Sequence, residues 1–157
     1  MADIPTSADL IEEEETIQLP FFNADVAWKI GSHIRAIAAA EQFPLAIEVS
    51  MSGSPLFYCA MPGASPNNRE WVRRKRNVVD RFHRSSLYIK TTLDEAGRTM
   101  LDRHALHPED YATSGGAVPV LVKGTGCIGA VAVSGLSQYD DHRLCVEAIQ
   151  AVIAELG

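Results

Sequence analysis

The stretch GTGCIGAVAVSG, residues 124–135, has the glycine spacing G-x-G-x-x-G of dinucleotide-binding sites. In such a site the glycines turn a strand into a helix, whose N-terminal amides receive a pyrophosphate. The residues after the second glycine predict a strand instead, because β-branched and small residues alternate. Ile128 and Ala130 fall on one face, and Val131 and Val133 fall on the other. We therefore interpret the stretch as the turn and second strand of a β-hairpin.

Two further observations favour the hairpin over a nucleotide site. The preceding segment VPVLVK, residues 118–123, is a second apolar strand, and glycine supplies the positive φ that a tight turn needs. A dinucleotide site also requires an acidic residue about 20 positions further on. Asp140 and Asp141 come too early, and Glu147 lies inside a predicted helix. The glycines therefore serve the shape of the backbone.

Other elements are predicted on both sides of this hairpin. They are a helix from Asn23 or Asp25 to about Gln42, strands at 45–51 and 56–61 joined by the turn SGSP, a helix from Pro66 to about Arg84, a helical stretch over about 86–103 interrupted near Gly97, and a C-terminal helix capped by Asp140 or Asp141. Hairpins predict a mainly antiparallel sheet with helices packed on it. The expected fold class is α/β in the broad sense, α+β, as one domain over residues 23–157 that follows an acidic N-terminal arm at residues 1–22.

Charge is distributed unevenly along the chain, whose formal net charge is -6. Residues 1–25 hold seven acids and no base, whereas residues 69–84 hold seven of the 14 bases. One interpretation is a solvated leader and a solvated helix face. The alternative is that the basic segment binds an anion or another subunit. Overall acidity argues against a nucleic-acid partner.

Composition indicates a globular protein of the cytoplasm. Apolar residues make up 46% of the chain and charged residues 22%, and no apolar run approaches the ~20 residues of a membrane span. The first residues show neither a signal peptide nor a transit peptide. Three widely spaced cysteines, Cys59, Cys127 and Cys145, argue against a disulfide framework and a thiolate zinc site. We expect no membrane association and no metal.

Candidate ligand-binding residues lie at the two ends of the hairpin and on the basic helix. They are Arg74, Lys75, Gly115, Gly116, Ser134, Asp141 and His142. The glycine pair, the turn after Ser134 and the start of the last helix are expected to converge on one cleft. The two bases would hold a carboxylate or phosphate, and the imidazole would donate or titrate. The alternative is that Asp141 only caps the last helix.

Three stretches carry a resemblance to a known family: REWVRRKRNVVDRFHRSS (69–86), YATSGGAVPVLVKGTGCIGAVAVSG (111–135) and YDDHRLCVEAIQAV (139–152). Their landmarks include Trp71 with Lys75, Gly115-Gly116 and Asp141-His142. Together they resemble a branch of the haem-degrading-domain family, relatives of haem-binding protein S and of the glycolate-cluster protein. The resemblance implies a central, mainly antiparallel sheet and assembly into higher homo-oligomers. It implies no particular reaction for this branch.

Three functions follow from these observations as hypotheses. The first is a small cytosolic domain that binds a small anionic ligand. The second, implied by the family name, is a haem-binding or haem-degrading protein; the chain has five histidines but no haem-attachment motif. The third is a scaffold without enzymatic activity, whose acidic arm or basic helix docks a partner or a neighbouring subunit. No catalytic residue is assigned.

Overall fold

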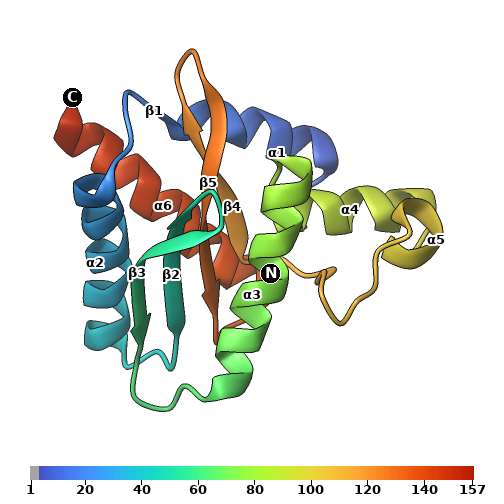
Figure 1. Cartoon of the computed structure of the whole chain (residues 1–157), viewed down its shortest axis with the longest axis horizontal. Helices are drawn as coiled ribbons and strands as arrows, with labels where there is room; N and C mark the ends of the chain where they lie inside the picture. The colour runs from blue at the N-terminus through green and yellow to red at the C-terminus, as the bar shows by residue number, and fades with distance from the viewer. Residues whose placement is uncertain (1–3) are drawn as a thin grey trace.

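A five-stranded sheet forms the centre of the molecule in the computed structural model, which describes residues 4–157 (Figure 1). Its strand order is β1-β4-β5-β2-β3. The elements are α1 (Ser7–Glu14), a 3-10 turn (Glu15–Ile17), β1 (Gln18–Leu19), α2 (Ala24–Glu41), β2 (Ala46–Met51), β3 (Ser54–Ala60), α3 (Pro66–Phe82), α4 (Ser86–Ala96), α5 (Met100–His104), β4 (Ala117–Val122), β5 (Gly126–Ser134) and α6 (Gln138–Leu156). The pairs β2–β3, β2–β5 and β4–β5 are antiparallel, and only β1 runs parallel to its neighbour β4. The predicted α+β class with a mainly antiparallel sheet is confirmed.

The hairpin of β4 and β5 forms as the sequence predicted. Gly124 and Gly126 have φ values of 78° and 102°, so the turn uses the freedom of glycine. Gly129 serves a different purpose. It lies inside β5, where a Cβ atom would come within 2.1 Å of the Ser50 carbonyl oxygen on β2. No glycine of the G-x-G-x-x-G spacing opens a helix.

The other hairpin is tighter than predicted. We expected the turn to take all of SGSP, but Ser54 and Pro55 already belong to β3. The turn itself consists of Ser52 and Gly53, both with positive φ, which is the geometry of a two-residue hairpin loop. The expected interruption near Gly97 is confirmed, since Gly97 ends α4 in the left-handed conformation.

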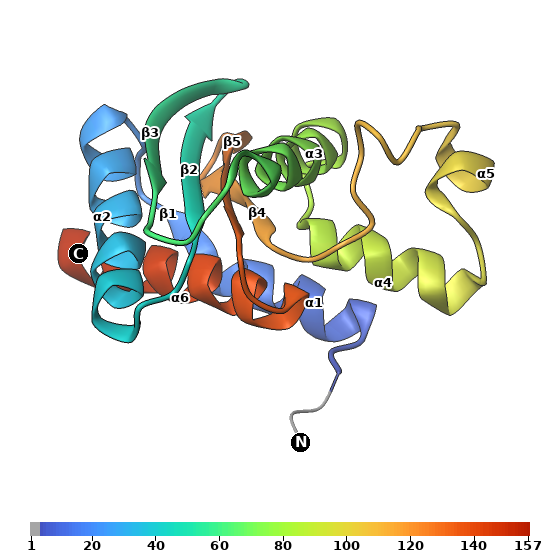
Figure 2. The ribbon, with the colours of Figure 1, turned by 90° about the horizontal axis from the view of Figure 1, so that it is seen from below.

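Helices cover both faces of the sheet (Figure 2). On one face, α2 and α6 pack against the branched side chains of the central strands, including Val131 and Val133. On the other face, Val72 and Val79 of α3 pack against small residues such as Ala130 and Ala132. The alternation from Ala130 to Val133 therefore separates two cores, and the small side chains let α3 lie close to the strands. Ile128 was expected on the face of Ala130 but packs on the face of Val131, because the pairing of β4 with β5 shifts register at this point.

The acidic arm contains structure that the sequence analysis did not predict. Helix α1 opens with a capping box at Thr6, and Leu10, Ile17 and Leu19 are buried. Strand β1 then adds a parallel edge to β4. The interpretation of the arm as a solvated leader therefore holds for exposed acids such as Glu12 and Glu15, and not for the buried Glu14 or the buried apolar side chains. Residues 1–3, including Asp3, lie outside the described residues.

The start of the last helix differs from the prediction. The last helix is capped by Ser137, whose hydroxyl accepts from the Asp140 amide, and not by Asp140 or Asp141. The serine precedes both acids, and Asp141 has a different partner, described below.

Within residues 4–157, no helix combines the length and apolarity that crossing a bilayer requires.

Candidate functional site

A cleft of about 310 Å³ lies where the end of β5 meets the start of α6 and the first half of α3. It is lined by Asn67, Asn68, Trp71, Lys75, Ser114, Ser134, Gly135, Leu136, Gln138 and Asp141. Of the candidate residues, Lys75, Ser134 and Asp141 line it directly, and Gly115 and Gly116 lie beside it. The predicted convergence of the glycine pair, the β5 turn and Asp141 is therefore observed.

An ion pair between Lys75 and Asp141 forms the floor of this cleft. Lys75 Nζ donates to Asp141 Oδ2 at 3.1 Å and to the Val133 carbonyl oxygen at 3.0 Å. The side chains are only 4% and 2% exposed. An ammonium carries three donors, and within residues 4–157 the third has no hydrogen-bond partner. Helical spacing in the sequence places Trp71, Lys75, Val78, Val79 and Phe82 on one face of α3, and Lys75 is the only charged residue among them.

Asp141 is surrounded by donors. Its Oδ1 accepts from the Leu136 amide at 3.0 Å, and the Gly135 amide also bonds the carboxyl group. Burial raises the pKa of Asp141, and the Lys75 ammonium and these amides oppose that rise. The carboxylate thus joins the β5–α6 turn to α3, which is a larger role than the helix cap that we considered.

The glycine pair is required by the close approach of these groups. Gly116 has φ of 133°, and a Cβ there would come within 2.5 Å of Lys75 Nζ and 2.8 Å of the Val133 carbonyl oxygen. At Gly115 a Cβ would come within 2.7 Å of the Gln138 carbonyl oxygen. The Gly115 amide donates to Gln138 Oε1 at 3.1 Å. Any side chain here would push α6 or Lys75 away from the cleft.

The rim of the cleft is polar and aromatic. Ser134 Oγ accepts from Asn68 Nδ2 at 3.3 Å, which ties β5 to the start of α3. The predicted site residue Arg74 does not line the cleft itself; its guanidinium lies 4.0 Å from the centroid of the Trp71 ring, a cation–π contact with a residue that does. Arg74 is partly exposed and donates to the Pro108 carbonyl oxygen at 3.3 Å. Within residues 4–157 it has no carboxylate partner.

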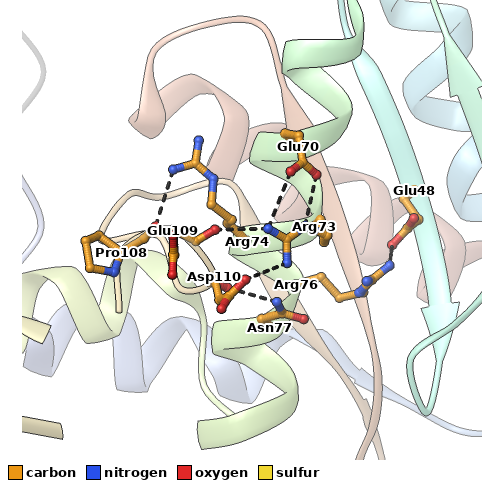
Figure 3. A network of polar contacts seen from close by, with 9 residues as sticks. All are labelled: Glu48, Glu70, Arg73, Arg74, Arg76, Asn77, Pro108, Glu109 and Asp110. Carbon is orange, nitrogen blue, oxygen red and sulfur yellow. Dashed lines mark hydrogen bonds and ion pairs between the residues drawn. The ribbon is translucent and has the colours of Figure 1, made fainter. Parts of the chain in front are cut away.

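Neighbouring residues of the basic segment fix the loop that precedes the cleft (Figure 3). Arg73 bridges Glu70 and Asp110, and Asn77 Nδ2 donates to the Asp110 carbonyl oxygen at 2.8 Å. Arg76 pairs with the buried Glu48 at 2.8 Å. The bases of residues 69–84 are therefore partly structural, and only Arg74 and Lys75 among them adjoin the cleft.

His142 lies away from this cleft, contrary to our expectation that it would share it with Asp141. Its Nε2 contacts Glu13 Oε1 of α1, and it lines a separate hollow of about 790 Å³ with Leu10, Leu87 and Tyr139. Consecutive helix residues point about 100° apart, which is the physical reason. A Ser134–His142–Asp141 triad is excluded by this geometry.

We expected no metal site in this chain. Within the described chain, no group of three or more histidine, cysteine or acidic residues is placed to hold a metal ion. His104 ends α5 and packs edge-on against Phe82 with ring centroids 4.7 Å apart. Cys59, Cys127 and Cys145 are free, and only Cys145 is fully buried.

Residues 22–150 match a protein family described as haem degrading protein HbpS-like. The chain belongs to this HbpS-like family. It is 46% identical over 143 residues to a UPF0303 protein of Azotobacter vinelandii, covering 91% of this chain and 86% of the relative. The predicted family resemblance is thereby confirmed.

Solved structures share the fold. The crystal structure of the Ybr137w protein superimposes with a TM-score of 0.89 at 26% identity, covering 99% of this chain and 91% of that one. The structure described as a PduOC:heme complex superimposes with a TM-score of 0.68 at 18% identity, covering 84% and 94%. At 18% identity, the second similarity shows a shared fold and nothing more.

The family description raises the question of whether these residues fit a haem. Axial ligation needs a free ring nitrogen facing an enclosed apolar slot. His142 borders the hollow of about 790 Å³, but its Nε2 is engaged by Glu13 and its Nδ1 is buried without a partner within residues 4–157. His83 and His107 are exposed on the surface, and the partly buried His104 packs against Phe82. In a single copy of this chain, these four histidines therefore do not fit a histidine-ligated haem.

Proposed function

We propose that this HbpS-like protein binds a small anionic ligand, a carboxylate or a phosphate, in the cleft above Lys75 and Asp141. The observation that carries the proposal is the buried Lys75 ammonium, which lines the cleft with one donor still free. A donor at the lining of a cleft is open to a ligand oxygen, and a hydrogen bond from a charged donor is stronger than one between neutral groups. A ligand oxygen would complete the hydrogen bonds of the ammonium.

The charge balance of the cleft limits the ligand. Asp141 neutralises Lys75, so the negative charge of a ligand must be met mainly by Arg74 and by neutral donors. The amides of Asn67, Asn68 and Gln138 and the hydroxyls of Ser114 and Ser134 supply such donors, and the Trp71 ring offers an apolar surface. A volume of about 310 Å³ is at the small end of the range for ligand pockets. These features favour a compact acid.

Thermal unfolding in the presence of inorganic phosphate and short carboxylates, at constant ionic strength, tests the proposal. A ligand at 100 times its Kd stabilises the fold by about 2.7 kcal/mol. For a domain of this size that corresponds to a rise in Tm of about 5–10 °C. Arg74→Gln should abolish most of this rise, whereas Arg73→Gln, one residue away and outside the cleft, should keep it.

The result that would overturn the proposal is an unchanged Tm with every acid tested, or an equal rise in wild type and Arg74→Gln. Haem remains the alternative ligand, which the family description supports. It predicts a Soret band that shifts on titration and is lost with one histidine substitution. Our proposal expects no such band from the wild type.

We further propose the cytoplasm as the compartment, which the three free cysteines support. Assembly of several copies is also part of the proposal, and its surface is derived in the next subsection. Deletion of residues 1–20 would be the simplest test of the scaffold hypothesis. That deletion would remove β1 and three buried apolar side chains, so a loss of partners would not be distinguishable from partial unfolding.

A further inference from the structure

The outer face of α2 is unusually poor in charge for an exposed helix. Eight of its residues are exposed, and four of them are alanines: Ala24, Asp25, Trp28, Arg35, Ala36, Ala39, Ala40 and Glu41. The face opposite the core of an amphipathic helix is normally covered by charged and polar side chains. Trp28 is 65% exposed, the second largest value among the exposed large apolar residues. Such a surface is typical of a contact with another protein.

The residues of this face form one continuous stripe. Asp25, Trp28, Ser32, Arg35 and Ala39 follow one another at intervals of three and four positions, so they lie along one side of the helix. The stripe is bordered by β3, because Trp28 meets Phe57 edge-on with ring centroids 5.6 Å apart. On its other side Lys29 pairs with Glu155 of α6. Figure 1 shows α2 at the outer edge of the molecule.

We propose that this stripe binds the same stripe of a second copy of the chain, with the two α2 helices antiparallel about a two-fold axis. Within residues 4–157, neither Asp25 nor Arg35 has an ion-pair partner, and they stand near opposite ends of the stripe. In a two-fold antiparallel contact each residue faces its complement twice. Placing Asp25 opposite Arg35 of the second copy therefore creates two ion pairs at once.

The same register also matches large side chains with small ones. It places Trp28 opposite Ser32 of the second copy. Phe21, which is 47% exposed, precedes α2 and adds an apolar side chain near the start of the helix. Ala24 then faces Ala36, which lets the helices approach closely. Charge and size thus agree on one arrangement, and a tryptophan at its centre is the type of residue that dominates interface energies.

This contact is independent of the proposed ligand site. Helix α2 covers the face of the sheet opposite to α3, which lines the cleft with Lys75. Failure of the ligand proposal would leave the contact in place, and failure of the contact would leave the cleft intact.

A charge-swap experiment on the full chain tests the contact, with mass measured by light scattering and sedimentation over a dilution series. The wild type should have an even multiple of the chain mass. Asp25→Arg and Arg35→Asp should each raise the dissociation constant of the α2 contact at least about tenfold, because like charges would then meet twice. The double variant D25R/R35D should restore the wild-type value. Glu41→Arg, an equal reversal at the end of the same helix, should change nothing.

Folding is controlled by circular dichroism, since Asp25 and Arg35 are exposed and the monomer should fold with either charge. Trp28→Lys supplies a second variant, which should dissociate the copies as well. A monomeric wild type would overturn the proposal. So would single reversals that leave the mass unchanged, or a double variant that stays dissociated while folded.

Discussion

Asp141 and His142 are neighbours in the first turns of α6, and each is buried and faces a charged residue that is distant in the sequence. The side chains of Lys75 and Asp141 are 4% and 2% exposed, so both partners of this pair are buried. His142 is 6% exposed, but its partner Glu13 remains 35% exposed. Water screens the second pair and can replace its partner, whereas it screens the buried pair much less. The exposure of the partner, more than that of the residue itself, should decide what each contact contributes.

The most direct way to break this comparison is Lys75→Met. It should lower the free energy of unfolding by about 3–5 kcal/mol, because Asp141 would be left as a buried charge without its counter-ion. Urea denaturation measures the loss. Lys75→Met combined with Asp141→Asn should recover part of it, since the asparagine is uncharged and can still accept from the Leu136 amide.

Arg73→Met is the matched control for this substitution. Arg73 pairs with Glu70 and Asp110, both more than half exposed, and its loss should cost less than about 1 kcal/mol. An equally small loss for Lys75→Met would show that burial on both sides does not set the strength of the pair.

Gly116→Ala tests whether the closeness of the groups around Lys75 matters. The added Cβ would meet Lys75 Nζ and the Val133 carbonyl oxygen, and the backbone would be held at positive φ. We expect a loss of about 2–3 kcal/mol by urea denaturation. Gly124→Ala also adds a Cβ at positive φ, but within residues 4–157 it meets nothing inside 4 Å, so it should cost only about 1 kcal/mol. Equal losses would remove the argument for a crowded site.

The sequence predicted the parts of this region that depend on local pattern. Alternating β-branched and small residues identified the β4–β5 hairpin, and helical spacing placed Lys75 on the apolar face of α3. It could not identify the partner of Lys75, because the side chains of Lys75 and Asp141 are 66 positions apart. It also missed α1 and β1. Strand β1 has only two residues, and α1 has a single buried apolar residue, Leu10, among its acids, so neither shows a clear hydrophobic pattern.

The contribution of α1, the helix that carries both Glu13 and Glu14, can be tested by the pH dependence of stability. Burial raises the pKa of Glu14 above its ordinary value of 4.5, and Arg84 partly opposes this. The folded state thus holds this proton more tightly than the unfolded chain, so its contribution to stability is complete below about pH 4.5 and is lost as pH rises through the folded pKa. Glu14→Gln should therefore gain stability relative to wild type, by on the order of 1 kcal/mol, between pH 4.5 and 7.

The control for this pH series is Glu12→Gln, at an exposed residue of the same helix. The difference in unfolding free energy between Glu12→Gln and wild type should stay constant between pH 4.5 and 7. The measurement is the unfolding free energy from a urea titration at each pH. If the difference between Glu14→Gln and wild type is also constant over this range, the prediction is contradicted.

The smallest effect is expected for Glu13→Gln, on the exposed side of the comparison. The glutamine can still bond His142, and water reaches the position that the carboxylate leaves, so the loss should be about 0.5 kcal/mol by urea denaturation at pH 7. Glu12→Gln should again be close to neutral. A loss for Glu13→Gln as large as that for Lys75→Met would mean that His142 needs its counter-ion as much as Asp141 does. The exposure of the partner would then no longer distinguish the two pairs, and α1 would have to be counted as part of the core that holds α6.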